Sequence, residues 1–411
     1  MTSNTHLSQK KLRYGVIGLK GIGRRHFQTV RDHKQCDLVA VADIDEALAR
    51  KVTNDLGITS YTDYRDMLKK ESLDVVSIAT PHNLHGSIGR DCLEAGAHVL
   101  MEKPLALRVS EADLLIEAAR KNGVKLGVCH QYRTFRVSQT LKNLIDSRAI
   151  GNIMRVLWSW GHLRQQSYYD QDPWRGTFRH AGGGILMSQA SHELDLICWL
   201  FGKPLQVTAM IGNQLHPIQV EDAASVQVRF ANGALGSFQF TLNQPKGYSI
   251  RQIAGDCGVL MIPNVKSLWG DENDEILLGN FGGSVHSSIS KFTQSKDEPN
   301  ISWKRIMLEE KQPPPKGWLS RFMGMQRQNH VNKKKRPHPL DQLVNNFIEA
   351  VLTGNEPLVT GESAHAAIEV INAIYLSAFR RKTVDLPIDR GEYDQLFLEM
   401  SKGTVRVPEF R

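Results

Sequence analysis

The sequence predicts an α/β fold in which a doubly wound parallel sheet is followed by an open, mostly antiparallel sheet. Two observations carry this prediction. Between residues 14 and 129, short apolar runs alternate with amphipathic segments of about ten residues, which is typical of parallel strands joined by helices. From about residue 151, longer alternating runs follow with few helices between them, which is typical of antiparallel strands.

The composition is that of an ordinary globular protein. Of 411 residues, 41% are hydrophobic and 23% are charged. A chain of this length needs neither disulfides nor a structural metal. Its five cysteines are scattered without a CxxC pair, which favours reduced thiols in the cytoplasm and excludes a zinc finger. No apolar run approaches the ~20 residues of a membrane helix, and residues 1–11 form a polar tail, so we expect no membrane partner and no metal.

The positive charge is concentrated in one segment. The formal net charge is +8, but residues 312–339 hold seven Lys and Arg and no Asp or Glu, which leaves about +1 for the rest of the chain. The same segment holds five prolines, which interrupt helices and strands. We therefore expect an exposed, solvated basic loop and no nucleic-acid partner.

The first predicted strand, Tyr14–Ile17, leads into a glycine turn that precedes a predicted helix. The turn contains Gly18, Gly21 and Gly23. Glycines allow the backbone to approach a pyrophosphate, and the N-terminus of the following helix favours phosphate. The turn departs from GxGxxG because Lys20 stands in the second place. Its side chain either crowds the pyrophosphate or swings out and pairs with a phosphate. Taken alone, such a turn also occurs as a tight strand-to-helix connection in other α/β proteins.

An acidic residue follows the second predicted strand, Leu38–Ala42. Asp43 comes 20 residues after Gly23, which is the spacing of a dinucleotide-binding unit. In such units the carboxylate accepts hydrogen bonds from a ribose diol. Asp43 favours NAD over NADP, because a 2′-phosphate would meet a carboxylate.

Further strands and helices extend the parallel sheet. The predicted strands are Val75–Ala79, His98–Met101 and Lys125–Cys129, and the predicted helices are Asp45–Leu56, Tyr64–Lys70, Gly86–Ala95 and one capped by Ser110 that runs through Ala119. Ligands of such sheets bind at the carboxyl ends of the strands. The residues that follow the strand ends, and that we expect to share one crevice, are Gly18, Asp43, Pro81, Lys103 and His130.

The second sheet is predicted from five runs: Met154–Trp160, Val207–Ile211, Ala224–Phe230, Ala234–Leu242 and Ile250–Ala254. Asn232-Gly233 separates two of them and predicts a hairpin. The helix-rich segment Asp341–Phe379 is expected to pack on this sheet or to return to the first.

A glycine-rich segment, Gly182–Gly184, is predicted to open a helix. Ser188, His192 and Asp195 follow at i, i+4 and i+7, and therefore on one face of that helix. Just upstream, Trp174 and Arg175 suit a sugar, because aromatic rings stack on sugar faces and arginine donates to hydroxyls or carboxylates. Packing of Trp174 into the sheet is the alternative.

Taken in order, these segments resemble the Gfo/Idh/MocA family of NAD(P)-dependent oxidoreductases over nearly the whole chain. The EKP tripeptide is the most specific signal. The matching segments are Arg24-Arg25-His26, Thr80 to His85, Glu102-Lys103-Pro104-Leu105, Gln131-Tyr132-Arg133, the glycine-rich segment with His192, Phe347–Val359 and Ala366–Pro387.

The resemblance implies a domain organisation. After the tail of residues 1–11, it implies a Rossmann domain for NAD(P) over residues 12–150. Over residues 151–411 it implies an α+β domain for substrate binding and oligomerisation, whose sheet face closes the nicotinamide crevice. It also implies a cis peptide bond between Lys103 and Pro104. The exposed face of the open sheet favours a homodimer or homotetramer.

The resemblance further implies roles for individual residues. Lys103 is the catalytic ammonium that polarises the alcohol oxygen, and His192 is the general base. Cofactor contacts are expected from Gly18, Lys20, Gly21, Gly23, Asp43, Thr80, Pro81, His85, Glu102 and Lys103. Substrate contacts are expected from Arg133, Trp174, Arg175, Ser188, His192 and Asp195.

Three of these roles have ordinary alternatives. Lys103 in isolation would be a surface lysine paired with Glu102, His192 a satisfied core histidine, and Asp195 a helix cap or internal ion-pair partner. Ser188 departs from the Asp or Asn of relatives and supplies no carboxylate to the substrate.

The predicted function is NAD-dependent oxidation of a secondary alcohol of a sugar, cyclitol or sugar derivative to a ketone. The substrate is thus a small polyol or sugar. One alternative is an NAD-dependent glycosidase of the same family, and the other is a non-catalytic sensor that binds NAD and sugar.

Overall fold

The computed structural model describes residues 11–54, 56–245, 249–262, 275–285, 301–308 and 337–409. The predicted polar tail lies outside the described residues except for Lys11. The predicted basic loop lies outside them except for residues 337–339.

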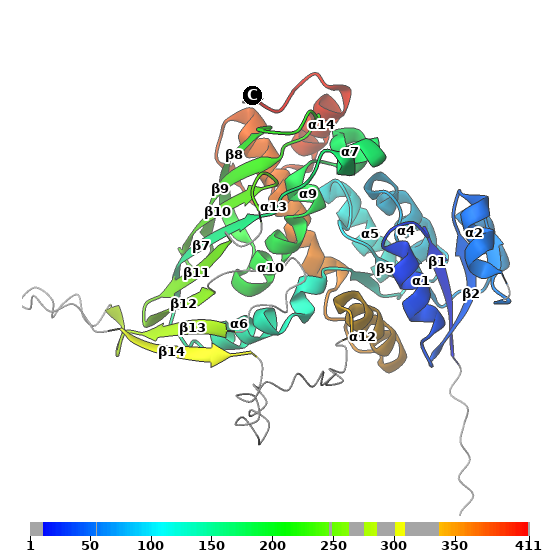
Figure 1. The fold of residues 1–411 in the computed structure, drawn as a ribbon, viewed down its shortest axis with the longest axis horizontal. Coiled ribbons are helices and arrows are strands. Elements are labelled where there is room, and N and C mark those ends of the chain that lie inside the picture. Colours follow the sequence, from blue (N-terminus) through cyan, green and yellow to red (C-terminus); the bar gives the residue numbers. More distant parts are fainter. Residues whose placement is uncertain are drawn as a thin grey trace, which may run out of the picture.

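Six parallel strands form the first sheet, in the order β3-β2-β1-β4-β5-β6. Figure 1 labels β1, β2 and β5 of this sheet. The strands are β1 (Leu12–Ile17), β2 (Cys36–Ala42), β3 (Thr59–Tyr61), β4 (Val75–Ile78), β5 (His98–Met101) and β6 (Leu126–Val128). Their apolar runs are buried from both sides, which is typical of parallel strands covered by helices. The five predicted strands are confirmed. The three-residue β3 was not predicted, because it is too short to show a period.

Five helices connect these strands: α1 (Gly23–Arg31), α2 (Glu46–Thr53), α3 (Tyr64–Lys70), α4 (His85–Glu94) and α5 (Val109–Lys121). Side chains of Asp45 and Asp63 cap α2 and α3. The predicted cap at Ser110 is wrong. Arg108 precedes α5, and the Ser110 hydroxyl lies inside the helix, where it donates to Asp394 at 2.8 Å.

The second sheet has nine strands in the order β14-β13-β12-β11-β7-β10-β9-β8-β15. Their bounds are β7 (Ile153–Gly161), β8 (Pro204–Gly212), β9 (Ala223–Phe230), β10 (Leu235–Thr241), β11 (Ile250–Gly255), β12 (Gly258–Ile262), β13 (Glu275–Asn280), β14 (Ser302–Met307) and β15 (Val384–Asp385). All pairs are antiparallel except β7 with β10. The hairpin at Asn232-Gly233 is confirmed, since β9 pairs antiparallel with β10 around it.

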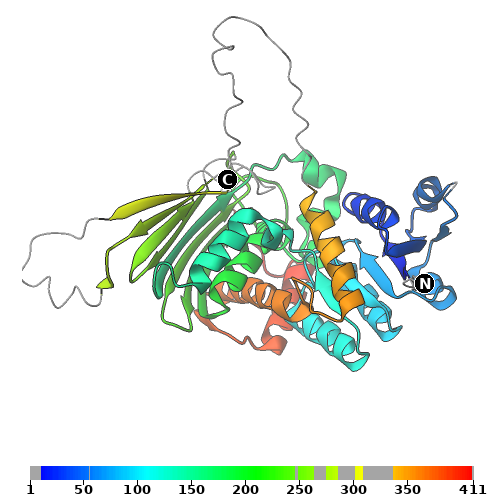
Figure 2. The same ribbon diagram turned by 90° about the horizontal axis from the view of Figure 1, so that it is seen from below.

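Helices cover one face of the second sheet and fill the space between the two sheets (Figures 1 and 2). They are α6 (Arg136–Asp146), α7 (Ser167–Gln171), α8 (Phe178–Ala181), α9 (Ile185–Ser188), α10 (Ser191–Phe201), α12 (Pro339–Thr353), α13 (Gly361–Arg380) and α14 (Arg390–Lys402). Three short 3-10 turns, η1 (His82–Leu84), η2 (Gln131–Thr134) and η3 (Pro173–Gly176), lie near the sheet edges.

The segment Asp341–Phe379 was predicted either to pack on the second sheet or to return to the first, and it does both. Helix α13 reaches the second sheet, where the Ser377 hydroxyl accepts a hydrogen bond from the backbone of Ala209 at 2.9 Å. The same helix holds α5 through Asn372, which accepts from the backbone of Val109 at 2.8 Å. Helix α12 returns to the first sheet, because its Asp341 forms an ion pair with Arg25 of α1.

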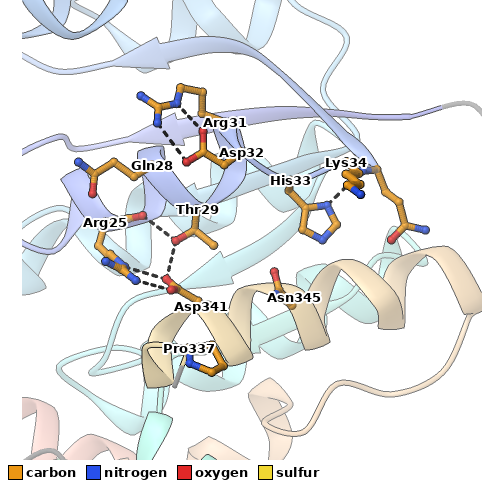
Figure 3. A pocket seen from close by; sticks show the side chains of 11 residues that line it. Arg25, Gln28, Thr29, Arg31, Asp32, His33, Lys34, Pro337, Asp341 and Asn345 are labelled. Atoms are coloured by element: carbon orange, nitrogen blue, oxygen red, sulfur yellow. Dashed lines mark hydrogen bonds and ion pairs between the residues drawn. The ribbon is translucent and has the colours of Figure 1, made fainter. Parts of the chain in front are cut away.

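A cavity of about 680 Å³ lies between α1, the segment after it and α12. Figure 3 shows Arg25 and Thr29 of α1 turned toward Asp341. Charged groups in its wall pair with one another, as Arg31 does with Asp32 at 2.8 Å. None of the predicted site residues lines this cavity. Within the described ranges, no helix combines the length and apolarity that a membrane span requires.

Candidate active site

The glycine turn after β1 is tight for steric reasons. Gly18 has φ +86°, and a Cβ there would lie 2.5 Å from the carbonyl oxygen of Ala79. A Cβ at Gly23 would lie 2.1 Å from the carbonyl oxygen of Gly18. Gly21 is open, with φ +54°. The turn thus brings bare backbone to the N-terminus of α1, and this cradle suits a pyrophosphate.

Lys20 and Asp43 complete the edge of this cradle. The Lys20 side chain is 74% exposed, and its Nζ lies 3.3 Å from an oxygen of Asp45, so it swings out toward that carboxylate. The oxygens of Asp43 accept from the backbone N–H of Leu19 at 2.8 Å and of Asp45 at 2.9 Å. These contacts fix the half-buried carboxylate at the end of β2. Each oxygen retains a lone pair for a ribose hydroxyl.

The segment after β4 contributes a hydroxyl. Oγ1 of Thr80 is buried and has no hydrogen-bond partner among the described residues, which leaves it open to a ligand. Pro81 follows as the exposed residue that precedes η1. His85 does not line the crevice as expected. Its ring is buried, and its nitrogens lie 2.7 Å from the carbonyl oxygen of Pro104 and 3.0 Å from that of Thr80, so it braces two strand ends.

Glu102 is also turned away from the expected cofactor contact. Its carboxylate accepts from Nε2 of His26 at 3.0 Å and from the backbone N–H of Lys103 at 3.2 Å. The network continues through Ser77, 3.1 Å from His26, to the hydroxyl of Tyr14 at 2.8 Å. Burial by itself raises the pKa of Glu102, but the hydrogen bond from His26 and the charges of His26 and Lys103 outweigh it and lower the pKa.

Among the described residues, one group has its ligating atoms close enough for a metal ion. His26, Glu102 and Cys129 offer atoms within 4.8 Å of one another. The first two are already hydrogen-bonded, and burial raises the pKa of the Cys129 thiol well above its usual range. The group is therefore best explained as a hydrogen-bond network behind Lys103.

Lys103 follows β5 and links the two halves of the chain. Its ammonium donates to the carbonyl oxygen of Ser188 at 2.5 Å. Burial lowers the pKa of Lys103 to about 8, with a further lowering by Arg164 and Arg175 that the charge of Glu102 opposes. The peptide bond to Pro104 is cis, as expected.

The single helix predicted after the glycines is wrong. Helix α9 ends at Ser188 and α10 begins at Ser191, because Gln189 leaves the helical conformation with φ −122°. The Ser188 hydroxyl donates to the carbonyl oxygen of Gly184 at 2.6 Å. Ser188 consequently holds Lys103 with its main chain, and its side chain does not point to a substrate.

Glu221, which was not predicted, anchors the second glycine-rich segment, Gly182–Gly184. Both of its oxygens lie 3.0 Å from the backbone N–H of Gly184, and one also accepts from the backbone of Leu186 at 3.1 Å and from the Tyr375 hydroxyl at 2.8 Å. A Cβ at Gly183 would lie 1.8 Å from that hydroxyl oxygen. Burial raises the pKa of Glu221 to about 7 despite these hydrogen bonds.

His192 lies on α10 and packs against two rings, those of Tyr132 and His130. Its ring stacks on Tyr132 at 4.6 Å between centroids and meets His130 edge-on at 5.5 Å. Its Nδ1 is buried without a hydrogen-bond partner in the described part of the chain. Burial, with the charges of Lys103 and His130, lowers the pKa of His192 well below its usual range. The neutral imidazole of His192 is therefore able to accept a proton.

Arg133 and Asp195 are not available for the predicted substrate contacts. They pair in the interior through two hydrogen bonds, of 2.9 Å and 2.6 Å, and are 1% and 0% exposed as side chains. Arg133 also donates to Ser363 at 3.1 Å. The alternative of an internal ion pair for Asp195 is therefore the one that the structure contains. Both groups are satisfied by each other, which leaves no donor or acceptor directed at a ligand.

Trp174 and Arg175 lie where the second half of the chain meets η1. The Trp174 ring meets His82 edge-on at 5.2 Å, so it does not pack into the sheet. Arg175 forms an ion pair with Asp172 at 2.9 Å and is near enough to Lys103 to lower its pKa. Lys103 is thus close enough to His192 for its charge to lower the pKa of that histidine, as Arg175 does for Lys103, while Glu102, Arg133 and Asp195 are buried.

Comparisons with known proteins show the family and the fold of the chain. Residues 12–130 match the model of an oxidoreductase family with an NAD-binding Rossmann fold, and residues 138–260 match the Gfo/Idh/MocA C-terminal domain. The chain is 27% identical to myo-inositol 2-dehydrogenase of Thermotoga maritima over 62% of this chain and 76% of that protein. It is 24% identical to D-apiose dehydrogenase of Paraburkholderia graminis over 98% of this chain and 97% of that protein.

Solved structures show the same architecture. The WlbA dehydrogenase of Bordetella pertussis, in complex with NADH and UDP-GlcNAcA, superposes with a TM-score of 0.73 at 26% identity, covering 92% of this chain and 99% of that one. The two matched family models span most of the described chain. The glycine cradle fits NAD, the cofactor that the first model names. The chain therefore belongs to the Gfo/Idh/MocA family and is an NAD-dependent dehydrogenase.

Proposed function

We propose that this dehydrogenase oxidises a secondary alcohol of a sugar, cyclitol or sugar derivative to a ketone. One contact carries the proposal. The ammonium of Lys103, at the end of β5, donates to the carbonyl oxygen of Ser188 at 2.5 Å, four residues before His192. The amine of one half of the chain is thus held by a residue four positions before the imidazole of the other half. The names of the inositol and apiose dehydrogenases support this substrate class.

The two side chains divide the acid-base work. The neutral imidazole of His192 accepts the hydroxyl proton, because burial and nearby positive charge keep it unprotonated. The ammonium of Lys103 donates a hydrogen bond to the same oxygen and stabilises its developing negative charge. NAD, when bound, supplies the acceptor for the hydride that leaves the carbinol carbon.

The residues that would hold NAD are those of the cradle. The N–H groups of Gly18, Leu19 and Gly23 already bond within the chain, so those of residues 20–22 would face the pyrophosphate. Asp43 would accept from the adenosine ribose. The Thr80 hydroxyl, which lacks a partner among the described residues, is placed beside the same strand ends. Lys20 points to Asp45 and leaves the cradle clear.

Turnover with a panel of sugars and cyclitols tests the function. We expect net NADH formation with at least one member. Lys103→Met is expected to lower kcat at least about 10³-fold and to change the Kd for NADH less than about threefold. The matched control is Lys69→Met, which removes an exposed lysine of α3 and should keep turnover.

Three outcomes reject the proposal. Sugar release without net NADH would identify the glycosidase, and NADH binding without turnover of any panel member would identify the sensor. Unchanged turnover in Lys103→Met would reject the role of that lysine.

Oligomerisation through the open sheet is part of the proposal. The face of the second sheet away from the helices exposes apolar side chains, among them Met210 at 74%, Leu235 at 59% and Ile250 at 50%. Such a face favours burial against another copy of the chain. Sedimentation should give a dimer or tetramer, and Met210→Lys should shift it toward the monomer. A monomeric wild type would contradict this part.

A further inference from the structure

Two arginines contact the same aromatic ring, that of Tyr168. The Cζ atoms of Arg164 and Arg175 lie 4.5 Å and 4.3 Å from the ring centre of Tyr168, a residue of α7. Each contact is favourable as a cation–π pair. Two guanidinium groups held by one ring nevertheless repel each other, so the arrangement calls for negative charge nearby.

The described part of the chain supplies only part of that charge. Arg175 pairs with Asp172 at 2.9 Å. Arg164 has no carboxylate within ion-pair distance in these residues, and its Nε is buried without a hydrogen-bond partner. Glu102, the buried carboxylate behind Lys103, faces His26. A buried guanidinium N–H without an acceptor is costly, and a ligand oxyanion removes that cost.

The position of Arg164 is fixed by its main chain. Its N–H donates to the carbonyl oxygen of Leu242 at 3.0 Å, and its carbonyl oxygen accepts from Nε2 of His216 at 2.9 Å. His216 is held in turn by Asp222 at 3.0 Å. The guanidinium therefore extends from a rigid support and not from a free loop.

The pair of arginines borders the catalytic groups. The positive charges of both arginines lower the pKa of Lys103. The charge of Arg164 also opposes the raising of the Tyr132 pKa by burial, and the Tyr132 ring stacks on His192 at 4.6 Å between centroids. Geometry places Arg175 in the same region, because its Cζ lies 5.3 Å from the ring centre of Trp174, and that ring meets His82, just after β4, edge-on at 5.2 Å. Strand β4 pairs with β5, which leads into Lys103.

We infer that Arg164 and Arg175, stacked on Tyr168, form a subsite for an oxyanion of the substrate, so that the oxidised alcohol belongs to an acidic sugar or cyclitol. The inference rests on the proposed function and narrows its substrate class. Carboxylate and phosphate share the chemistry that a guanidinium fork recognises. Neutral polyols offer no charge to this pair.

Matched substrates test the inference. We would measure kcat/KM for D-glucose, D-glucuronate and D-glucose 6-phosphate, and for the corresponding galactose series. A carboxylate or phosphate member is expected to exceed its neutral partner at least about 100-fold, and the better of the two identifies the source of the oxyanion. A neutral sugar that equals or exceeds its acidic partners would overturn the inference.

Variants locate the effect. Arg164→Ala is expected to lower kcat/KM for the acidic substrate roughly 100-fold while changing that for the neutral sugar less than about threefold. Arg164→Lys should restore part of the loss because it keeps the charge. Arg179→Ala, at an exposed arginine of α8, is the matched control and should change neither value. Equal losses for acidic and neutral substrates in Arg164→Ala would overturn the inference.

A binding measurement separates this inference from the proposed function. Calorimetric titration of the NADH complex with D-glucuronate and with D-glucose needs no turnover. Selective binding of the acid that Arg164→Ala abolishes would support the subsite even if no sugar is oxidised. Turnover without any preference for acids would reject the subsite and leave the dehydrogenase standing. NADH affinity of the variant, measured first, shows that it is folded.

Discussion

Two buried glutamates stand behind the two catalytic candidates, and their pKa values shift in opposite directions. Glu102 lies behind Lys103, with His26 and the ammonium of Lys103 as neighbours, and its pKa is lowered. Glu221 lies behind the turn that leads to His192. Its partners are backbone N–H groups and the Tyr375 hydroxyl, and its pKa is raised to about 7.

The difference teaches what decides the charge of a buried acid. Burial is the largest single influence on both pKa values and raises each of them. Positively charged neighbours reverse the result at Glu102, whereas neutral donors at Glu221 do not. Glu102 therefore acts as a fixed anion that supports an ammonium. Glu221 acts as a clamp whose protonation changes near neutral pH.

Gly183→Ala is the most disruptive test of the hydrogen bonds around Glu221. A Cβ at this position would lie 1.8 Å from the hydroxyl oxygen of Tyr375, which is itself held by Glu221. We expect the free energy of unfolding to fall by at least about 3 kcal/mol, measured by urea denaturation. Gly21→Ala, at an open position with φ +54°, should cost only about 1 kcal/mol. Equal losses in the two variants would contradict the clamp.

Glu221→Gln tests the raised pKa through stability. The pKa rises from 4.5 in the unfolded chain to about 7 in the folded one, so the folded state holds the proton more tightly. Wild-type stability from this group is fully present below pH 4.5 and is lost as pH rises to about 7. The advantage of wild type over the variant should shrink by about 3 kcal/mol across this window.

The measurement is urea denaturation of both proteins at several pH values. Glu102→Gln provides the contrast, because a lowered pKa gives stability that is present above the unfolded pKa and is lost only as pH falls through the folded one. Parallel pH dependence of wild type and Glu221→Gln would refute the raised pKa.

Glu102→Gln is also expected to change catalysis. The charge of Glu102 raises the pKa of Lys103 against the lowering by burial. Without that charge the ammonium loses its proton at lower pH, so the alkaline limb of kcat/KM should move below its wild-type position near pH 8. We expect a roughly 10- to 100-fold loss at pH 8. Glu46→Gln, at an exposed site on α2, is the control, and superimposable pH profiles would show that Glu102 has no such effect.

Tyr14→Phe should have the smallest effect. It removes the hydroxyl that lies 2.8 Å from Ser77, at the far end of the network that reaches Glu102. We expect a loss of about 1 kcal/mol in the free energy of unfolding and less than a twofold change in kcat. A larger loss of kcat would mean that the whole network supports Lys103.

Periodicity predicted five of the six strands of the first sheet and five of the nine described strands of the second, since β12 to β15 were not predicted. The buried strands of the first sheet and the hairpin at Asn232-Gly233 carry strong local signals. The short strand β3 and the break at Gln189 carry none, because the first is three residues long and the second is a local backbone change between two helical turns.

The site was harder to predict, because its contacts join residues far apart in the sequence. The motifs located Lys103 and His192, but not their partners. Arg133 and Asp195 pair across 62 residues, and Glu221 reaches Gly184 across 37. Polar residues near a crevice satisfy one another or face a ligand, and only the docking of one half on the other decides which.

The bond between Lys103 and the main chain at Ser188 has an evolutionary consequence. Every amino acid has a carbonyl oxygen, so replacement of the side chain at this position leaves the acceptor for the amine in place. Related enzymes are therefore free to vary residue 188 as they adapt to new substrates while the lysine keeps its anchor.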